Sequence, residues 1–377
     1  MKILFDCTFL DDKPTGIPVY FYSLFRNLLK LNNADEYIII VGHRYDTYEL
    51  NKSLEEFSNY RIVKIICFNS LIPIISSFII PIYLRYYKAD VYHNPRFFGP
   101  FYKLSKTKIV ITVHDLYHKT VPEQMPWKSN LLMNVFSDYA IKRADQVIVI
   151  SNQTKQDVIK YLNISEGKLN LIYQAVDGDL IIKDEPKISR KILDLNLNNS
   201  KNILCVGTML PSKGLQDLVL AFANLYNSYK ISPNLKLIFA GKTTYFTEEI
   251  LKLIKSQDIP SDIIKVLGFV SDDELIYLYQ NANIYVIPSY YEGFGLTAIE
   301  AMGFDCPVIA RNSSSLIEVV GDAGLLFNNI EELTSGLFKL LNDTNFRSEI
   351  INKAKIHRMK FTNKRRTAET YLVYKKK

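Results

Sequence analysis

Residues 284–328 read IYVIPSYYEGFGLTAIEAMGFDCPVIARNSSSLIEVVGDAGLLFN, and this segment decides the fold. A short apolar run opens it, a loop with two glycines follows, and a helical pattern begins near Leu296. A second apolar run comes after that helix. Short apolar runs that alternate with helices are typical of parallel α/β sheets. The segment therefore predicts a strand-loop-helix unit whose loop lies at the carboxyl edge of a sheet, where such folds bind their ligands.

The same alternation continues along all 377 residues. We predict an α/β protein with one Rossmann-like domain over 1–178 and a second over 201–360, separated by a polar linker at 179–200. The natural binding site of two such domains is a central cleft that both parallel sheets face. The expected strands are 2–6, 37–41, 62–67, 91–93, 109–113, 146–150 and 169–173, then 202–207, 236–240, 264–267, 284–287 and 308–310, with helices such as 17–31 and 151–162, the latter capped by Ser151.

Composition indicates an ordinary globular protein, with 48% hydrophobic and 23% charged residues. The net charge of +7 favours anionic partners such as phosphates or an acidic membrane leaflet, and no feature indicates nucleic acid. The N-terminal apolar run is too short for a signal peptide, so we expect a cytoplasmic protein. The four cysteines have no CxxC spacing and are predicted to be buried free thiols: Cys7, Cys67, Cys205 and Cys306.

One apolar stretch, residues 71–87, has the sequence LIPIISSFIIPIYLRYY. Two prolines interrupt it, and it falls short of the ~20 residues that a membrane-spanning helix needs. Two interpretations stay open. The stretch is either a buried helix of the first domain, or its apolar side and the neighbouring Arg85 and Lys88 touch a bilayer surface.

Glu292 and Glu300 flank the start of the helix in the segment quoted above. At ~1.5 Å per helical residue their carboxylates stand up to ~12 Å apart. Two glycosidase carboxylates require roughly 5 to 9.5 Å, so this spacing suits a longer ligand with hydroxyls at both ends and a negative middle, such as a nucleotide sugar. Gly293 and Gly295 allow backbone N–H groups to approach a diphosphate at the positive end of the helix. The alternative is an exposed loop glutamate and a helix-surface glutamate.

Two further loops are candidates for phosphate contact. Lys213, in VGTMLPSKG, precedes a helix and is placed to neutralise a diphosphate, unless it is simply a solvated lysine. Gly16, in DDKPTGIPVY, precedes another helix and either closes its backbone on a phosphate or makes a plain turn.

Histidines at strand ends are the third group of candidates. His114, in ITVHDLYH, is expected to point into the cleft and hydrogen-bond a sugar hydroxyl, with Asp115 orienting it or facing the acceptor. His93 is expected on the acceptor side. The alternative for such a residue is a histidine satisfied within the core. One HxxxH pair occurs, His114 and His118, and no Asp-x-Asp directly follows a predicted strand; we expect no metal site and no cofactor.

The run EGFGLTAIEAM resembles the Glu, seven residues, Glu signature of the retaining GT-B glycosyltransferases of family four, also called glycosyl transferases group 1. The similarity extends over the chain and is strongest from 202 to 327. It implies a GT-B fold with the C-terminal helix 361–377 joined to the first domain, a nucleotide-sugar donor bound mainly by the second domain, and retention of anomeric configuration.

The resemblance also implies residue roles. Glu292 contacts the donor sugar, Glu300 contacts the ribose, and Gly293, Phe294, Gly295 and Leu296 surround the sugar and phosphates. His114 matches the cleft histidine, and Glu318 occupies a position of the pattern. Thr208 and Ser212 stand where the family usually has an arginine. We place both on the donor side with Lys213, and Arg311 is a candidate to supply the missing charge.

The function implied is transfer of a hexose, with mannose the leading candidate, to a saccharide or polyprenyl-linked saccharide in surface polysaccharide biosynthesis. The enzyme would lie in the cytoplasm, with peripheral contact to the inner membrane face. Two alternatives are a noncatalytic nucleotide-sugar-binding GT-B subunit and a GT-B-type sugar-nucleotide epimerase. A nicotinamide dehydrogenase is disfavoured because no GxGxxG follows the first strand.

Overall fold

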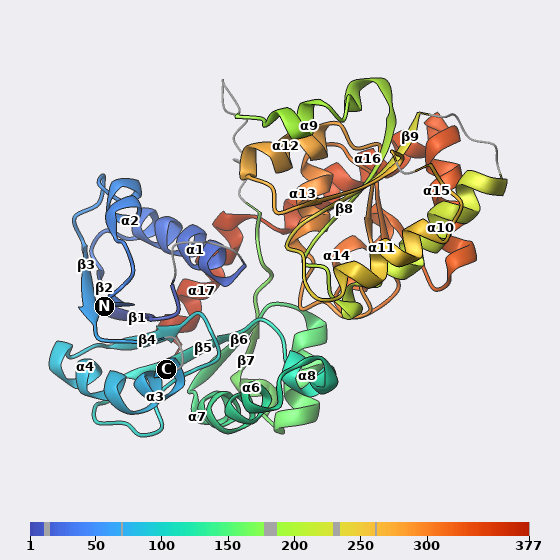
Figure 1. The fold of residues 1–377 in the computed structure, drawn as a ribbon. Coiled ribbons are helices and arrows are strands. Elements are labelled where there is room, and N and C mark those ends of the chain that lie inside the picture. The colour runs from blue at the N-terminus through green and yellow to red at the C-terminus, as the bar shows by residue number, and fades with distance from the viewer. Residues whose placement is uncertain (11–15, 69–70, 177–186, 229–233, 261, 377) are drawn as a thin grey trace. The chain divides into compact units, whose positions relative to one another are not determined.

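The computed structural model describes residues 1–10, 16–68, 71–176, 187–228, 234–260 and 262–376. The chain forms two compact units, which are described separately below. Unit 1 comprises Met1–Ala175 and Asn363–Lys377, and unit 2 comprises Val176–Thr362. In each unit, helices pack on the faces of a parallel sheet (Figure 1).

Within the described part of unit 1, seven parallel strands form one sheet in the order β3-β2-β1-β4-β5-β6-β7. The order runs outward from β1 in one direction and from β4 in the other, so these two strands flank the switch point at which open α/β sheets bind ligands. The strands are β1 (Lys2–Cys7), β2 (Glu36–Gly42), β3 (Tyr60–Ile65), β4 (Val91–Asn94), β5 (Lys108–Val113), β6 (Gln146–Val149) and β7 (Leu169–Leu171).

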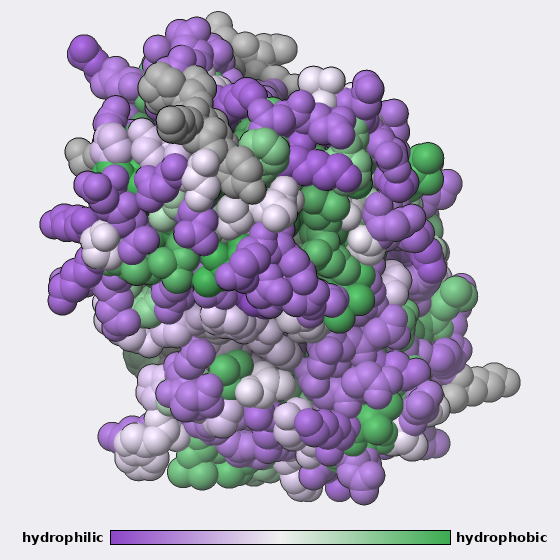
Figure 2. All heavy atoms as spheres, turned by 90° about the vertical axis from the view of Figure 1, so that its right-hand side faces the viewer, coloured by the Kyte–Doolittle hydropathy of each residue, from purple (hydrophilic) through white to green (hydrophobic). Residues whose placement is uncertain are grey.

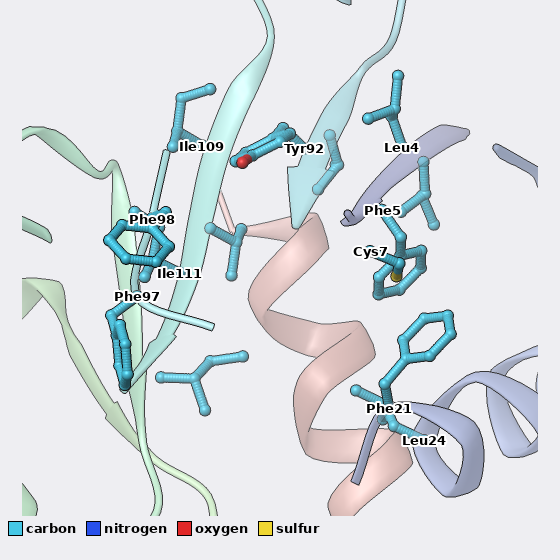
Figure 3. Packing of buried hydrophobic residues seen from close by; sticks show 14 of the residues in the cluster. Leu4, Phe5, Cys7, Phe21, Leu24, Tyr92, Phe97, Phe98, Ile109 and Ile111 are labelled. Atoms are coloured by element: carbon cyan, nitrogen blue, oxygen red, sulfur yellow. The ribbon is translucent and has the colours of Figure 1, made fainter. Parts of the chain in front are cut away.

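The helices of unit 1 include the last helix of the chain, α17, which packs on α1. Tyr371 of α17 donates its hydroxyl to Asp35 at 2.8 Å, and Arg366 donates to Ser23 Oγ at 2.8 Å. Figure 3 shows Phe21 and Leu24 of α1 packed beside Phe5 and Cys7 of β1. The helices are α1 (Ile17–Leu31), α2 (Tyr48–Ser53), α3 (Ile72–Ile74), the π turn η2 (Ile75–Ile79), α4 (Ile80–Tyr87), α5 (Tyr117–Thr120), α6 (Trp127–Leu132), the π turn η4 (Met133–Ser137), α7 (Asp138–Arg143), α8 (Asn152–Leu162) and α17 (Asn363–Lys375).

Within the described part of unit 2, six parallel strands follow the order β10-β9-β8-β11-β12-β13. The switch point lies between β8 and β11. The strands are β8 (Lys201–Val206), β9 (Leu235–Ala240), β10 (Ile264–Gly268), β11 (Ile284–Ile287), β12 (Val308–Arg311) and β13 (Leu325–Phe327); the helices are α9 (Arg190–Leu193), the 3-10 turn η7 (Pro211–Lys213), α10 (Leu215–Ser228), α11 (Thr247–Lys255), α12 (Asp272–Gln280), α13 (Leu296–Gly303), α14 (Leu316–Val320), α15 (Ile330–Asn342) and α16 (Thr344–His357).

The strands predicted from the sequence are confirmed within a few residues at their ends, and β13 is the strand that hydrophobic periodicity does not predict. The predicted cap is confirmed, since Ser151 Oγ accepts the N–H of Thr154 at 3.0 Å. Of the segment 179–200, residues 179–186 lie outside the described residues. The remainder packs on unit 2, where Lys191 of α9 donates to the carbonyl of Leu267.

The apolar stretch 71–87 is helical and has one buried side, and contact of its other side with a bilayer stays a prediction. Ile75, Ile80 and Leu84 face the core of unit 1, whereas Ile82 and Tyr86 are exposed. Over the described residues, no helix combines the length and apolarity needed to cross a membrane. All four cysteines are free and buried, as predicted. Elsewhere, Figure 2 shows a face on which polar side chains dominate and apolar ones form several groups.

Candidate active site

The central pair of the site joins Lys213, at the end of η7, with Glu292, in the loop between β11 and α13. Lys213 Nζ lies 2.6 Å from Glu292 Oε1, and Ser289 Oγ donates to the same oxygen at 2.7 Å. The two side chains remain 26% and 17% exposed, so the pair borders solvent. The structure therefore brings together two residues that the sequence placed separately in phosphate-binding and sugar-binding loops.

The topology explains why these residues meet. β8 and β11 are neighbours in the sheet, and the loops after parallel neighbouring strands share its carboxyl edge. Gly214 permits the close approach of the two loops. Its φ is +61°, and a Cβ there would stand 2.2 Å from the carbonyl oxygen of Pro288. Any side chain at position 214 would push the two loops apart.

A run of serines after β12 supports the Glu292 loop. Glu292 N donates to Ser314 Oγ at 3.0 Å, and Ser313 Oγ donates to the carbonyl of Ser289 at 2.9 Å. Ser315 Oγ lies 2.8 Å from the carbonyl of Glu292 and 2.9 Å from that of Phe294. Sequence reasoning missed these positioning residues. The signal that could have found them is a run of small hydroxyl side chains at the end of a strand next to β11.

The helix α13 starts at the same loop. Its N-cap, Gly295, has φ +102°, and a Cβ there would stand 2.7 Å from Leu316 Cδ2. Glu300 lies in the second turn and accepts the hydroxyl of Tyr279 at 2.9 Å. Burial raises the pKa of the Glu300 carboxyl, and the Tyr279 hydrogen bond opposes this effect. The hydrogen bond from Tyr279 therefore fixes the Glu300 carboxyl, which is partly exposed on the helix that follows the Glu292 loop.

The other predicted donor-side residues have different surroundings. Phe294 buries its ring against Phe361, with centroids 5.6 Å apart, so its side chain belongs to the core. Ser212 is also buried, and its carbonyl accepts Tyr290 N at 2.8 Å. The half-exposed residues are Thr208 in the loop after β8, Gly293, Leu296 at the start of α13, and Glu318 in the first turn of α14.

Arg311, the candidate for the missing charge, is held by other contacts in this structure. Its guanidinium pairs with Asp217, and its Nε donates to the carbonyl of Pro288 at 2.8 Å. The group also stacks over the Tyr290 ring, 4.4 Å from the centroid. Because these contacts occupy its donors and bury the side chain, we infer that Arg311 stabilises the loop after β11.

In unit 1, His114 lies buried at the end of β5. Its Nε2 is 2.8 Å from the carbonyl of Pro95, and its Nδ1 is 3.0 Å from Gln174 Nε2. Burial lowers its pKa to about 4, so the ring is neutral near pH 7. The bonds are consistent with a proton on Nε2 that is donated to Pro95 and an Nδ1 that accepts from Gln174. A sugar hydroxyl would have to replace one of these bonds.

His93 is buried in unit 1, and its acceptor-side role stays a prediction. The side chain has no exposed surface, and its nitrogens bond the hydroxyls of Tyr374 at 2.6 Å and Thr112 at 2.8 Å. Asp115 accepts Tyr117 N at 2.9 Å. Gly16 has φ +60° and precedes α1, with the carbonyl accepting Tyr20 N at 3.0 Å. Residues 11–15 of its loop lie outside the described residues.

Among the described residues, His, Cys, Asp and Glu side chains form no group of three or more that could hold a metal ion. Lys213 and Glu292 are among the charged groups at the carboxyl edge of the second sheet.

Two parallel α/β units of this topology give the chain a GT-B fold. Solved structures support the fold over nearly the whole length. Sucrose-phosphate synthase from Thermosynechococcus elongatus matches with a TM-score of 0.74 and 18% identity, covering 99% of this chain and 98% of that one. Anabaena HepE in complex with UDP and glucose matches with a TM-score of 0.71 and 19% identity, with the same coverage.

The family follows from the sequence. The model described as Glycosyl transferases group 1 matches residues 188–357, and the model described as Glycosyltransferase Family 4 matches residues 14–180. The chain belongs to the glycosyl transferases group 1, as the EGFGLTAIEAM motif predicted. Among curated relatives, the O-antigen chain mannosyltransferase B of Escherichia coli is 29% identical over 294 residues, which is 78% of this chain and 76% of that protein.

Proposed function

We propose that this glycosyltransferase moves a hexose, with mannose the leading candidate, from a nucleoside diphosphate sugar to a saccharide or polyprenyl-linked saccharide in surface polysaccharide assembly. The observation that carries the donor class is the Lys213–Glu292 pair at the N-terminal end of α13. A cation and a helix N-terminus suit a diphosphate, and an adjacent carboxylate suits sugar hydroxyls. Mannose and the saccharide acceptor are inferred from the O-antigen mannosyltransferase relative.

When the donor binds, its own groups replace the contact between Lys213 and Glu292. The β-phosphate takes Lys213, and hydroxyls of the sugar donate to Glu292. Glu300, already oriented by Tyr279, accepts hydroxyls of the ribose. Acceptor recognition is assigned to unit 1, where His114 stays a predicted contact.

The reaction breaks the bond between the anomeric carbon and the β-phosphate oxygen. Negative charge then grows on the phosphate, where Lys213 and the backbone N–H groups at the start of α13 stabilise it. The acceptor oxygen bonds to the anomeric carbon on the face that the phosphate leaves, so configuration is retained. Its proton passes to the departing phosphate oxygen, which balances the reaction without a separate general base.

The proposal includes transfer without a metal and a cytoplasmic location. Lys213 provides the charge that a metal would otherwise bring to the diphosphate. Four buried free thiols suit a reducing compartment.

The test is a thermal-shift screen of the full chain against UDP-, GDP-, ADP- and dTDP-sugars in the presence of EDTA. One nucleotide family should raise the melting temperature, because ligand binds only the folded chain. Lys213→Ala should lose this stabilisation, and Lys252→Ala, at an exposed lysine of α11, should keep it. No shift with any donor, or an equal shift in both variants, contradicts the proposal. The anomeric configuration of the product, read by NMR, tests retention.

A further inference from the structure

Unit 1 carries two rows of exposed apolar side chains, each with four-residue spacing. The first row runs along α3, η2 and α4, and Tyr86 at its end is 76% exposed. The second runs along α6, η4 and α7, and Trp127 at its start is 72% exposed. We call them together the two-row surface, with members Ile74, Phe78, Ile82 and Tyr86 in the first row and Trp127, Leu131, Val135 and Tyr139 in the second.

A π turn lies within each row. An α-helix has 3.6 residues per turn, so side chains four apart drift steadily around its axis. A π turn takes more residues per turn and offsets that drift. Ile75–Ile79 and Met133–Ser137 are such turns. Each row therefore stays on one side of its helix, opposite the residues that pack into the core, such as Ile80 and Ile141.

The two rows meet at Phe101. Its ring centroid lies 5.4 Å from that of Phe78 and 4.3 Å from that of Tyr139. Tyr102 donates its hydroxyl to the carbonyl of Phe78 at 2.8 Å, and its ring is exposed beside them. Leu104, also exposed, follows two residues later. The rows thus form one apolar surface rather than two separate ones.

The charges around this surface are mostly positive. Residues 66–106 and 123–145 contain four acids, Asp90, Glu123, Asp138 and Asp145; Glu123 is exposed, and Asp145 pairs with Lys103 at 2.6 Å. Asp138 is buried and pairs with Lys119 at 2.6 Å, and Asp90 accepts Lys2 N at 2.7 Å. The same segments carry the exposed basic side chains Arg85, Lys88, Lys106, Lys128, Lys142 and Arg143.

We infer that the two-row surface docks unit 1 onto an anionic lipid bilayer without spanning it. Exposed Trp and Tyr suit the membrane interface because their rings are apolar and their edges are polar. Exposed Ile and Leu enter the boundary of the acyl chains, and the basic rim is attracted to anionic headgroups. A symmetric contact with a second copy of the chain would instead place the basic side chains of one copy against those of the other, and like charges repel.

The inference does not depend on the donor or on transfer. If the acceptor is polyprenyl-linked, docking on the bilayer would hold the enzyme at the surface where that acceptor lies.

Trp127 provides the test, because it is the single tryptophan of the chain. The full protein is titrated with phosphatidylcholine vesicles, with and without phosphatidylglycerol, while Trp127 emission is followed. We expect a blue shift and vesicle co-flotation with the anionic vesicles. Ile82→Ser with Tyr86→Ser keeps the reporter and should weaken partitioning about tenfold. Arg85→Gln should weaken it about fivefold on anionic vesicles only.

The matched control is Ile356→Ser with Met359→Ser, two exposed apolar positions of unit 2, and it should bind like the unmodified chain. An unchanged emission with both vesicle types overturns the inference, as does equal loss of binding in the control. A concentration-dependent blue shift without vesicles also overturns it and assigns the surface to self-association. The assay contains no nucleotide sugar, so its failure leaves the proposed transfer function standing.

Discussion

Lys213 Nζ and Glu292 Oε1 lie 2.6 Å apart, although 79 positions separate the two residues in the chain. Each group is the one that a nucleotide sugar needs, and in the donor-free chain each is bound by the other. Because this ion pair is partly exposed, its two groups can exchange partners without leaving an unpaired charge in the core. In the proposed donor site, phosphate binding by Lys213 and sugar binding by Glu292 would therefore each compete with this ion pair.

Glu292→Gln is predicted to separate these two effects. The amide is a poorer acceptor for sugar hydroxyls, and we expect transfer to slow by about 10²-fold or more. Lys213 loses its anionic partner, so a nucleoside diphosphate without sugar should bind about tenfold more tightly. Initial rates and calorimetric titration with the nucleoside diphosphate measure the two outcomes.

The matched control is Glu248→Gln, at an exposed glutamate of α11, which should change neither quantity. If the nucleoside diphosphate binds the Glu292→Gln protein no better than the unmodified chain, Lys213 does not exchange partners.

Gly214→Ala tests the close contact between the loops after β8 and β11. A left-handed φ of +61° and a Cβ 2.2 Å from the carbonyl oxygen of Pro288 should together cost about 2–4 kcal/mol of stability. Gly167→Ala is the control, because a Cβ there would meet open space. Urea unfolding of both variants gives the comparison, and similar midpoints would show that the loop relaxes without strain.

Much of this site could be predicted from the sequence because the signals are local. Alternating apolar runs located the strands, and the turn residues located the loops after them. Lys213 and Glu292 each lie in the connection that follows a strand, and parallel topology brings loops at the same sheet edge together. The motif around Glu292 then identified the family.

The remainder depended on tertiary contacts. His93 and His114 have the same sequence setting, a histidine at a strand end, but Tyr374 of α17 covers His93 from 281 positions away. No local pattern shows that return of the chain. Arg311 likewise looks free in the sequence, and only the folded loop pairs it with Asp217.

The buried histidines predict a dependence of stability on pH. Burial lowers the pKa of His93 to about 3 and that of His114 to about 4. In the unfolded chain both titrate near ~6.5, so below this pH the unfolded state binds protons that the folded state does not. Stability is therefore complete above pH ~6.5 and falls towards pH 4 by ~1.4 kcal/mol per pH unit for each histidine.

Urea unfolding of the full chain at pH 7.5, 6.0 and 5.0, followed by circular dichroism, measures this slope. His93→Gln removes one titrating group and keeps an amide that can bond the neighbouring hydroxyls, so it should lower the slope below pH 6 by up to ~1.4 kcal/mol per pH unit. A slope unchanged by this variant would assign the effect to other groups.

Asp6 is the buried carboxylate that ties β1 to its neighbours in unit 1. Its Oδ2 accepts Ser76 Oγ at 2.6 Å, Tyr92 OH at 3.0 Å and Asn94 Nδ2 at 3.1 Å. Its Oδ1 accepts the hydroxyl of Thr8 at 2.8 Å. Ser76 belongs to η2, so this carboxylate fixes the helix of the first exposed row to the sheet.

Asp6→Ala should leave several buried donors without an acceptor and cost about 3–5 kcal/mol. For a unit of this size the loss lowers the melting temperature by about 10 °C. Glu55→Ala, at an exposed acid of the same unit, should leave it unchanged. Asp6→Asn keeps one acceptor oxygen, so its melting temperature should lie between those of the two alanine variants. If the Asp6→Ala and Glu55→Ala proteins have the same melting temperature, the donors around Asp6 find other partners and the carboxylate does not hold η2 in place.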